Sequence, residues 1–422
     1  MQNRNNNGNT DKAAALRAAE SVDRTLYNAL HAVFVDGAFC AQALTKALKG
    51  LTNLRAHPFT TSAFYGVLDN NVRLEKIIDG LCDRPPDKNT RIVLKIGMFY
   101  LRYADMPDYA AVNRAVELAK RVGAFSGFVN AVLKKSRDYT PVFASELEKF
   151  SYECNTPEWL CKCMIADYGE TRAKSILCAV LPQKTHIRPI LKRISREQFE
   201  SAAKGGELTE YGCYAERSIM DNFAPGTVAV QSVSSVRAVN AYKRGVERGD
   251  VLDLCAAPGG KSVYLSELGD YNITACDIYA HKLDLMRGYA KKYGAKLNVA
   301  LNDATVLNLS FIDKFDLVIA DCPCSGTGTL KTKPDIMLKR KPSDIKELCE
   351  LQKKIVDVAA RYCKKGGVLC YSTCSVLRDE NERIAEYFIE NHPEYARADE
   401  TKLLPDSDNC DGFYIARFKR CD

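Results

Sequence analysis

The chain has 422 residues, of which 46% are hydrophobic and 27% charged, a composition typical of a globular protein with two or three domains. No apolar run approaches the 18 or more residues of a membrane-spanning helix, and the opening MQNRNNNGNT lacks the apolar core of a signal peptide. These features exclude membrane and secreted classes, so we expect a cytoplasmic protein with its 17 cysteines reduced.

The net charge of +7 is concentrated near the N-terminus. Residues 1–140 hold 20 Lys and Arg against 13 Asp and Glu, whereas the remainder holds 40 of each (60 − 20 and 53 − 13). A basic first part favours binding of a polyanion such as nucleic acid. A solvated helical surface is the alternative interpretation.

Taken in chain order, residues 1–10 are predicted to be a disordered tail, and residues 11–137 carry apolar residues at helical spacing. The second segment is therefore predicted to be an all-α bundle. Residues 138–155, with a Thr-Pro step and mixed polar residues, are typical of a linker. Residues 156–230 combine one capped helix with short extended runs, which indicates a small α+β domain that connects the others or contacts RNA.

From residue 231 to residue 422, short apolar strands alternate with helices, a pattern that predicts a parallel, doubly wound α/β sheet. The expected strands cover residues 250–255, 272–278, 297–303, 315–322 and 367–374. The run GFYIARFKR is predicted to add an antiparallel strand.

Ligands of doubly wound sheets bind beyond the carboxyl ends of the strands. The first strand ends in VLDLCAAPGGKS, whose small residues let a ligand approach the backbone, although it is neither a G-x-G-x-x-G motif nor a P-loop. The following strands end at Asp277, at Asn302-Asp303 and at Asp321. One such acid is most often a cap, but four consecutive strand ends of this kind favour a nucleoside cofactor.

Two cysteines also close apolar runs, Cys324 in DCPCSG and Cys374 in GGVLCYSTCS, fifty positions apart (374 − 324 = 50). A nucleophilic thiolate requires such a loop-edge position rather than the core. No second cysteine pair at zinc-ligand spacing exists, so we expect no metal site. Packing remains the alternative for either thiol.

The motifs DLCAAPGGKS, DCPCSGTG and YSTCS together closely resemble the RNA (cytosine-5)-methyltransferases, and AAVNRAVELAKR and GFVNAVLKK resemble the RNA-binding factor NusB. This combination resembles the bacterial Sun/Fmu group of ribosomal RNA methyltransferases (RsmB/NOP family). The resemblance implies a NusB-like RNA-binding bundle and a Rossmann-like, class I methyltransferase domain that uses S-adenosylmethionine. It also implies one cytosine of 16S rRNA, free or in an early assembly intermediate, as the substrate.

The resemblance also implies roles for individual residues. Cys374 would attack C6 of the cytosine, Cys324 would help the covalent adduct break down, and Asp321 with Lys261 would stabilise the attacked base. Asp277 would bind the ribose of the cofactor and Asp303 would lie near its adenine. The implied cofactor-binding residues are Cys255, Ala256, Ala257, Pro258, Gly259, Gly260, Lys261, Asp277, Asp303 and Asp321.

The sequence departs from the family pattern at three places, where Ser232 replaces Asp, Ile190 replaces Asn, and Lys333 replaces His. We expect these changes to affect RNA contacts rather than catalysis.

Other functions remain open at this point. In the DNA-type cytosine-5 arrangement Cys324 would attack and Cys374 would be structural. An exocyclic-amine methyltransferase would carry an aromatic residue where Cys324 stands. The related tRNA enzymes share the catalytic motifs, and a non-catalytic RNA-binding assembly factor would need neither thiol.

Overall fold

The computed structural model describes residues 7–421 and divides them into two compact units. The first extends to Lys162 and includes Met337–Lys339, and the second comprises Cys163–Ile336 and everything from Arg340 onward. Residues 1–6 of the predicted tail lie outside the described residues, whereas residues 7–10 belong to the first helix.

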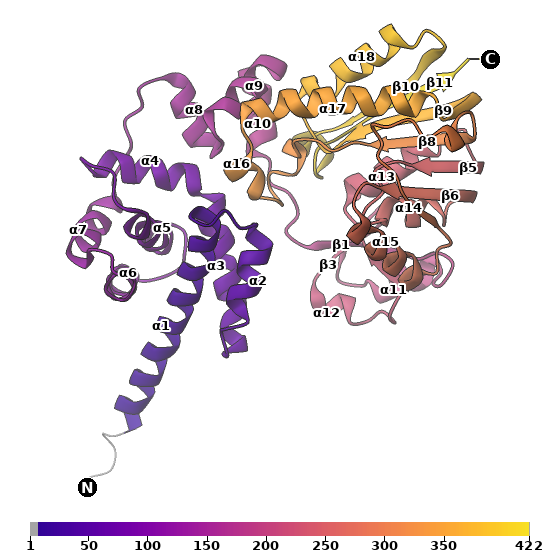
Figure 1. Ribbon diagram of the computed structural model, residues 1–422. Helices are drawn as coiled ribbons and strands as arrows, with labels where there is room; N and C mark the ends of the chain where they lie inside the picture. The colour runs from indigo at the N-terminus through magenta and orange to yellow at the C-terminus, as the bar shows by residue number, and fades with distance from the viewer. Residues whose placement is uncertain (1–6, 422) are drawn as a thin grey trace. The chain divides into compact units, whose positions relative to one another are not determined.

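The first unit is all-α, as its helical periodicity predicts. Helix α5 is the most buried helix of this unit, with 11 of its 15 residues buried. It forms the centre around which the other helices pack (Figure 1). The helices are α1 (Asn7–Phe34), α2 (Cys40–Leu48), α3 (His57–Asp69), α4 (Asn71–Leu81), α5 (Lys88–Arg102), α6 (Asp108–Val122), α7 (Ser126–Ser136) and α8 (Glu146–Cys154).

Helix α8 lies inside the segment 138–155 that the sequence predicts as a linker, so the structure differs from that prediction. The side chain of Ser145 accepts a hydrogen bond from the Glu148 backbone, and the Glu148 carboxylate accepts one from the Ala144 backbone. The guanidinium of Arg73 on α4 donates to the Tyr152 carbonyl oxygen at 3.0 Å. These contacts attach residues 146–154 to the bundle.

The second unit contains a small antiparallel sheet of order β2-β3-β1-β4, built from the segment predicted as a separate α+β domain. Helices α11 and α12 follow its first and third strands in the chain. The elements are α9 (Glu158–Tyr168), which begins in the first unit, α10 (Glu170–Cys178), β1 (Thr185–Pro189), α11 (Arg196–Ala202), β2 (Glu207–Thr209), β3 (Gly212–Ala215), α12 (Arg217–Met220) and β4 (Val228–Val230).

The large sheet has seven strands in the order β10-β11-β9-β8-β5-β6-β7. The pairs from β9 to β7 are parallel, whereas β11 pairs antiparallel with both β9 and β10. Five predicted parallel strands and the antiparallel GFYIARFKR strand are therefore present. The strands are β5 (Arg248–Asp253), β6 (Asp270–Asp277), β7 (Asn298–Leu301), β8 (Phe315–Asp321), β9 (Cys363–Thr373), β10 (Tyr395–Leu403) and β11 (Phe413–Arg420).

Helices cover both faces of this sheet (Figure 1). On one face α17 and α18 pack against alternate residues such as Val318 and Leu369, and on the other α13 packs against the intervening residues such as Leu317 and Val368. The helices are α13 (Val233–Tyr242), α14 (Gly260–Leu265), α15 (Ala280–Tyr293), α16 (Asp335–Lys339, ending in the first unit), α17 (Pro342–Ala360), α18 (Glu382–Asn391) and α19 (Pro405–Asp408). The doubly wound architecture fixes where the parallel strands end.

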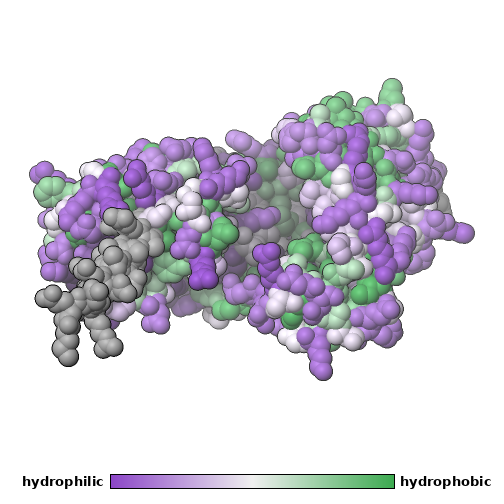
Figure 2. All heavy atoms as spheres, turned by 90° about the horizontal axis from the view of Figure 1, so that it is seen from below, coloured by the Kyte–Doolittle hydropathy of each residue, from purple (hydrophilic) through white to green (hydrophobic). Residues whose placement is uncertain are grey.

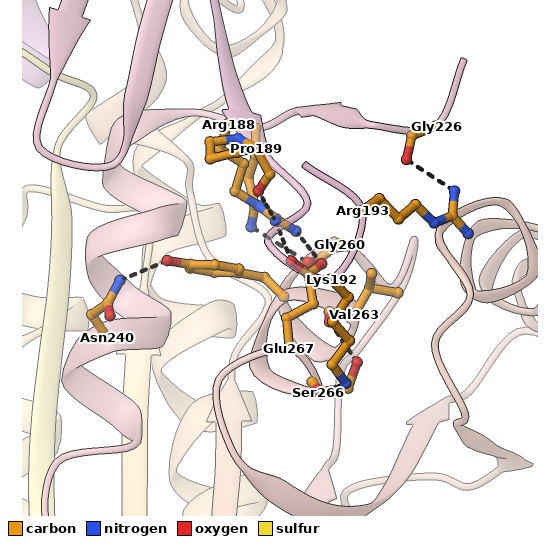
Figure 3. A network of polar contacts seen from close by, with 12 residues as sticks. Arg188, Pro189, Lys192, Arg193, Gly226, Asn240, Gly260, Val263, Ser266 and Glu267 are labelled. Carbon is orange, nitrogen blue, oxygen red and sulfur yellow. Dashed lines mark hydrogen bonds and ion pairs between the residues drawn. The ribbon is translucent and has the colours of Figure 1, made fainter. Parts of the chain in front are cut away.

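An ion pair joins the small sheet to the turn between α14 and β6, which helps to explain why the two sheets belong to one compact unit. Arg188 of β1 is 1% exposed and donates to both carboxylate oxygens of Glu267, at 2.8 and 3.0 Å (Figure 3). Its guanidinium lies 4.0 Å from the centre of the Tyr264 ring, and its Nε donates to Gln231 at 2.7 Å. A buried bidentate pair of this kind fixes both position and orientation.

Hydrophilic residues cover most of the face shown in Figure 2, with apolar residues scattered among them. Within residues 7–421, no helix combines the length and apolar character that crossing a bilayer requires.

Candidate active site

The order of the large sheet reverses at β5, which has β6 on one side and β8 on the other. A cavity of about 460 Å³ lies beyond the carboxyl ends of these strands. Five of the predicted cofactor-binding residues line it, namely Cys255, Ala257, Asp277, Asp303 and Asp321. The volume and the position at the switch point are those of a small-molecule site.

The loop after β5 is shaped by its glycines and by a buried acid. Gly259 has a φ of +103°, a conformation that favours glycine, and α14 starts at the next residue. Asp253, at the end of β5, accepts a hydrogen bond of 2.5 Å from the Ser262 hydroxyl. Burial raises the pKa of Asp253 to about 6, against the opposing effect of this bond. The acid thus holds the strand end to the start of α14.

The acids of the next two strand ends are held in place by local contacts. Asp277 accepts from the backbone of Tyr279 at 3.1 Å and pairs with Lys282 at 3.3 Å. Asp303 accepts from the backbone and hydroxyl of Thr305, at 2.9 and 2.7 Å, and these hydrogen bonds lower the pKa of Asp303. Both carboxylates retain lone pairs for hydroxyl or amine donors of a ligand.

The remaining wall supplies apolar surface and one unsatisfied donor. Asn302 is 8% exposed, and its Nδ2 is buried without a hydrogen-bond partner within the described residues. A buried donor without a partner destabilises a protein unless a ligand accepts a hydrogen bond from it. Apolar lining residues, which the sequence does not single out, include Ile278, Ala304, Leu351 and Ile355. Carboxylates, an amide and apolar walls together fit a nucleoside.

Lys261 makes an ion pair with Asp321, with Nζ and Oδ2 2.6 Å apart. The other oxygen of Asp321 accepts from Ser372 at 3.0 Å, and Ser372 bonds to Tyr242 at 2.6 Å. Burial opposes the charge on Lys261, but the Asp321 carboxylate outweighs burial and raises the pKa of Lys261. The acid on the cavity wall and the ammonium beyond it therefore act as one unit.

The two strand-end thiols meet because β8 and β9 pair in parallel with Asp321 opposite Ser372. Cys324 and Cys374 follow these residues, and their sulfur atoms lie 3.3 Å apart as free thiols. This separation is a hydrogen-bond contact. The fifty-residue spacing thus brings both predicted thiols to one point.

The surroundings make the two thiols unequal. The hydrogen bond from Cys324 lowers the pKa of Cys374 despite burial, and the ammonium groups of Lys333 and Lys261 act in the same direction. The same bond, burial and the Glu380 carboxylate raise the pKa of Cys324 well above its usual range. The surroundings therefore favour ionisation of Cys374 over ionisation of Cys324.

Two further cysteines at this edge of the sheet behave differently. Burial raises the pKa of Cys255 and that of Cys322 far above the ordinary value. Among these four neighbouring thiols, the environment favours ionisation at Cys374 alone.

Five of the predicted cofactor residues are not part of the cavity wall: Ala256, Pro258 and Gly259 belong to the loop after β5, and Gly260 and Lys261 begin α14. Sequence reasoning also missed Glu380 and Asn381, which hydrogen-bond to the loops of both thiols. Their only sequence signal is a polar pair in TCSVLRDEN, directly after the second cysteine motif.

Two of the three departures from the family pattern have structural explanations. Ser232 caps α13, its hydroxyl accepting from the Ser235 backbone, and serine and aspartate are both good N-caps. Ile190 is fully buried in a cluster with Val263 and Tyr293, so it packs the small sheet against α14 and α15. The third, Lys333, contributes positive charge at Cys374.

Within residues 7–421, no group of three or more His, Cys, Asp or Glu side chains has the arrangement of a metal site.

The sheet order, the helices on both faces and the nucleoside-sized cavity define a Rossmann-like methyltransferase fold. The family model for 16S rRNA methyltransferase RsmB/F matches residues 244–419, and that of the NusB family matches residues 12–138. The chain belongs to the RsmB/F family, with a NusB-family region at its N-terminal side. The predicted fold class and the predicted family resemblance are thereby confirmed.

Individual relatives agree with this result. The chain is 30% identical to the probable ribosomal RNA small subunit methyltransferase B of Bacillus subtilis, over 85% of this chain and 90% of the relative. It is 28% identical to ribosomal RNA small subunit methyltransferase B of Xanthomonas campestris, over 96% and 98%. The crystal structure of PH0851 has the same fold, with a TM-score of 0.78 at 22% identity over 95% of this chain and 99% of that one.

Proposed function

We propose that the protein transfers a methyl group from S-adenosylmethionine to C5 of a cytosine in 16S rRNA, by way of a covalent bond between Cys374 and C6. The observation that carries this proposal is the pair of unequal thiols, 3.3 Å apart, next to the Asp321–Lys261 ion pair. A chain that only bound RNA would need no such arrangement.

The cavity supports S-adenosylmethionine as the cofactor, which supplies an electrophilic methyl group when bound. Asp277 would accept from ribose hydroxyls, and Asp303, with the unpartnered Asn302 amide, would contact the adenine. The apolar wall residues Leu351 and Ile355 would cover the adenine ring. Asp321 lies on the same wall, and the target base would bind on its side of the cavity.

Cytosine C5 is a poor nucleophile until a thiolate adds to C6. Addition of Cys374 forms the S–C6 bond and shifts electron density toward C5 and N3, which makes C5 able to accept the methyl group. The Asp321–Lys261 unit would stabilise the density at N3 and the exocyclic amine. After the methyl group has been transferred, C5 carries both this group and its original hydrogen, which must be removed as a proton.

Cys324 is assigned to the release of the adduct. The contact with Cys374 is the main cause that raises the pKa of Cys324, and this cause disappears once Cys374 is bonded to C6 and no longer anionic. Cys324, whose side chain is partly exposed, can then lose its proton to solvent and accept the one on C5. The electron pair of the C5–H bond restores the C5–C6 double bond, and the S–C6 pair returns to Cys374 as the thiolate leaves.

The RNA partner is supported by the NusB-family region and by the basic balance of residues 1–140. Both named relatives act, by their names, on small-subunit ribosomal RNA. Methylation of tRNA by the same chemistry and a purely structural role in ribosome assembly are the alternatives.

Bisulfite sequencing of total RNA tests the proposal. In a strain that lacks the gene, bisulfite should convert one cytosine of 16S rRNA that it does not convert in the parent strain. Returning the intact gene should restore the protection from bisulfite, whereas returning the Cys374→Ala gene should not. Loss of protection in a tRNA instead would contradict the rRNA assignment. Restoration by Cys374→Ala would contradict the covalent chemistry.

A further inference from the structure

Glu380 is a fully buried acid, with 0% exposure, at the end of the short turn Arg378–Glu380 that follows the Cys374 loop. Its side chain does not line the cavity and does not contact the thiols directly. A buried carboxylate is costly unless hydrogen bonds satisfy it. The partners that satisfy this one belong to the two cysteine loops.

Both oxygens of Glu380 accept hydrogen bonds from neutral donors. Oε1 accepts from the backbone of Ser325 at 2.7 Å and from the Gln352 amide at 3.2 Å. Oε2 accepts from the Ser375 hydroxyl at 2.6 Å and from the Ser325 hydroxyl. Ser325 follows Cys324 and Ser375 follows Cys374, so one carboxylate ties together the residues next to both thiols.

Asn381 and Gln352 make further hydrogen bonds to the two cysteine loops. Asn381 accepts from the Thr373 hydroxyl at 2.6 Å and donates to the Ser375 carbonyl oxygen at 2.9 Å, on either side of Cys374. Gln352 donates to the Pro323 carbonyl oxygen at 2.9 Å, directly before Cys324. The contact between the two sulfur atoms is therefore held by a network centred on Glu380.

We propose that Glu380 is a positioning residue of the reaction, which holds the two cysteine loops together so that Cys374, and not Cys324, is the attacking thiolate. This inference rests on the function proposed above, because it presumes that the two thiols have different tasks. Glu380 acts through these thiols and touches neither RNA nor cofactor in this assignment.

The charges around the pair favour this role. Lys333 and Lys261 face Cys374, and both lower the pKa of its thiol. Glu380 and Asp321 both raise the pKa of the Cys324 thiol, and Asp321 also raises that of Cys374, so Glu380 is the carboxylate that distinguishes the two. The guanidinium of Arg340 donates to the carbonyl oxygen of Cys324 at 3.3 Å and binds its backbone rather than its sulfur. Replacing Glu380 with a neutral group removes one of the negative charges that raise the pKa of the Cys324 thiol.

Alkylation of the free full-length enzyme by a limiting amount of iodoacetamide tests the proposal, because both thiols are partly exposed and each lies in a separate peptide. In the unmodified protein we expect mass spectrometry to find Cys374 labelled well ahead of Cys324. In Glu380→Gln the Cys374 to Cys324 labelling ratio should fall at least roughly fivefold, the size expected when a buried hydrogen bond is lost. The turnover number should fall while the KM for RNA changes little.

Glu382→Gln is the matched control, since Glu382 lies two residues further on and pairs with Lys402 instead. Its labelling ratio should equal that of the unmodified protein. If circular dichroism shows that Glu380→Gln is unfolded, Ser375→Ala decides, with a smaller drop in the ratio expected. An unchanged ratio in a folded Glu380→Gln, or in Ser375→Ala when that variant decides, overturns the proposal. Because the assay contains no RNA or cofactor, it is independent of whether Cys374→Ala abolishes methylation.

Discussion

Two thiols of identical chemistry differ here only in what faces them. Besides the contact between the two sulfur atoms, the ammonium groups of Lys333 and Lys261 lower the pKa of Cys374, the Glu380 carboxylate raises that of Cys324, and Asp321 raises both. The sequence motifs show only that two cysteines are present. The register of β8 and β9 brings them together, and their surroundings lower the pKa of Cys374 and raise that of Cys324. Their tasks should therefore separate cleanly in single variants.

Mixing each variant with substrate RNA and S-adenosylmethionine, followed by denaturing electrophoresis, should reveal this difference. Cys374→Ala should form no RNA–protein adduct, because no thiolate remains at the attacking position. Cys324→Ala should attack and then fail to release, so that a band of RNA bound to protein accumulates. Cys349→Ala, which removes a partly exposed thiol whose pKa burial raises to about 12, should behave like the unmodified protein. A band from Cys374→Ala and none from Cys324→Ala would instead indicate the DNA-type arrangement.

At the scale of elements, the apolar runs of β5, β6, β8 and β9 were sufficient to predict these strands, because they are covered on both faces. Strand β10 (Tyr395–Leu403) could not be predicted in this way. It is an edge strand whose burial is confined largely to its two ends, so charged residues interrupt any apolar pattern. Glu380 was missed for a related reason, since a buried acid has no periodic signal and its partners lie 55 and 28 residues away.

The ion pair between Arg188 and Glu267 is the element-scale contact whose loss should be most costly. Arg188→Met would leave Glu267, 5% exposed, as a buried charge without its partner. We expect the free energy of unfolding of the second unit to fall by about 3–5 kcal/mol. Arg193→Met is the comparison, since the exposed Arg193 donates to carbonyl oxygens of Gly226 and Lys292 and should cost less than about 1 kcal/mol.

Urea denaturation followed by tyrosine fluorescence and circular dichroism measures this difference. The double variant Arg188→Met/Glu267→Met should recover part of the loss, because two apolar side chains no longer leave a charge unpaired. Equal midpoints for Arg188→Met and Arg193→Met would show that the buried pair does not hold the small sheet in place.

For the whole molecule, composition alone indicated a basic N-terminal part, with 20 Lys and Arg against 13 Asp and Glu over residues 1–140. The structure adds that residues 26–133 contain their own buried core, which predicts that residues 1–162 fold when expressed alone. The domain limits at 137 and 155 remain predictions. Composition could not reveal α8, because its attachment depends on Arg73 and Asn155, which lie 82 residues apart in the chain.

The isolated segment 1–162 should bind RNA with an affinity that falls steeply as salt rises, since phosphate contacts by Lys and Arg release counterions. Fluorescence anisotropy of a labelled rRNA fragment between about 50 and 200 mM salt measures the slope. The second unit, whose 37 Lys and Arg are nearly matched by 36 Asp and Glu, should show a shallower slope. Binding by segment 1–162 that does not change with salt would contradict an electrostatic role for it.

Strand β11 also has a consequence for synthesis on the ribosome. It lies between β9 and β10, it packs Phe413 under the ammonium of Lys261, and the Gly412 backbone donates to the Gly328 carbonyl oxygen. The thiols and the ion pair are thus complete only when residues 412–420 have left the exit tunnel. The helical bundle, translated first, can fold before that moment. On the proposed function, a nascent chain would therefore be able to bind RNA before it is able to methylate it. A chain that ends before residue 412 would lack methyltransferase activity.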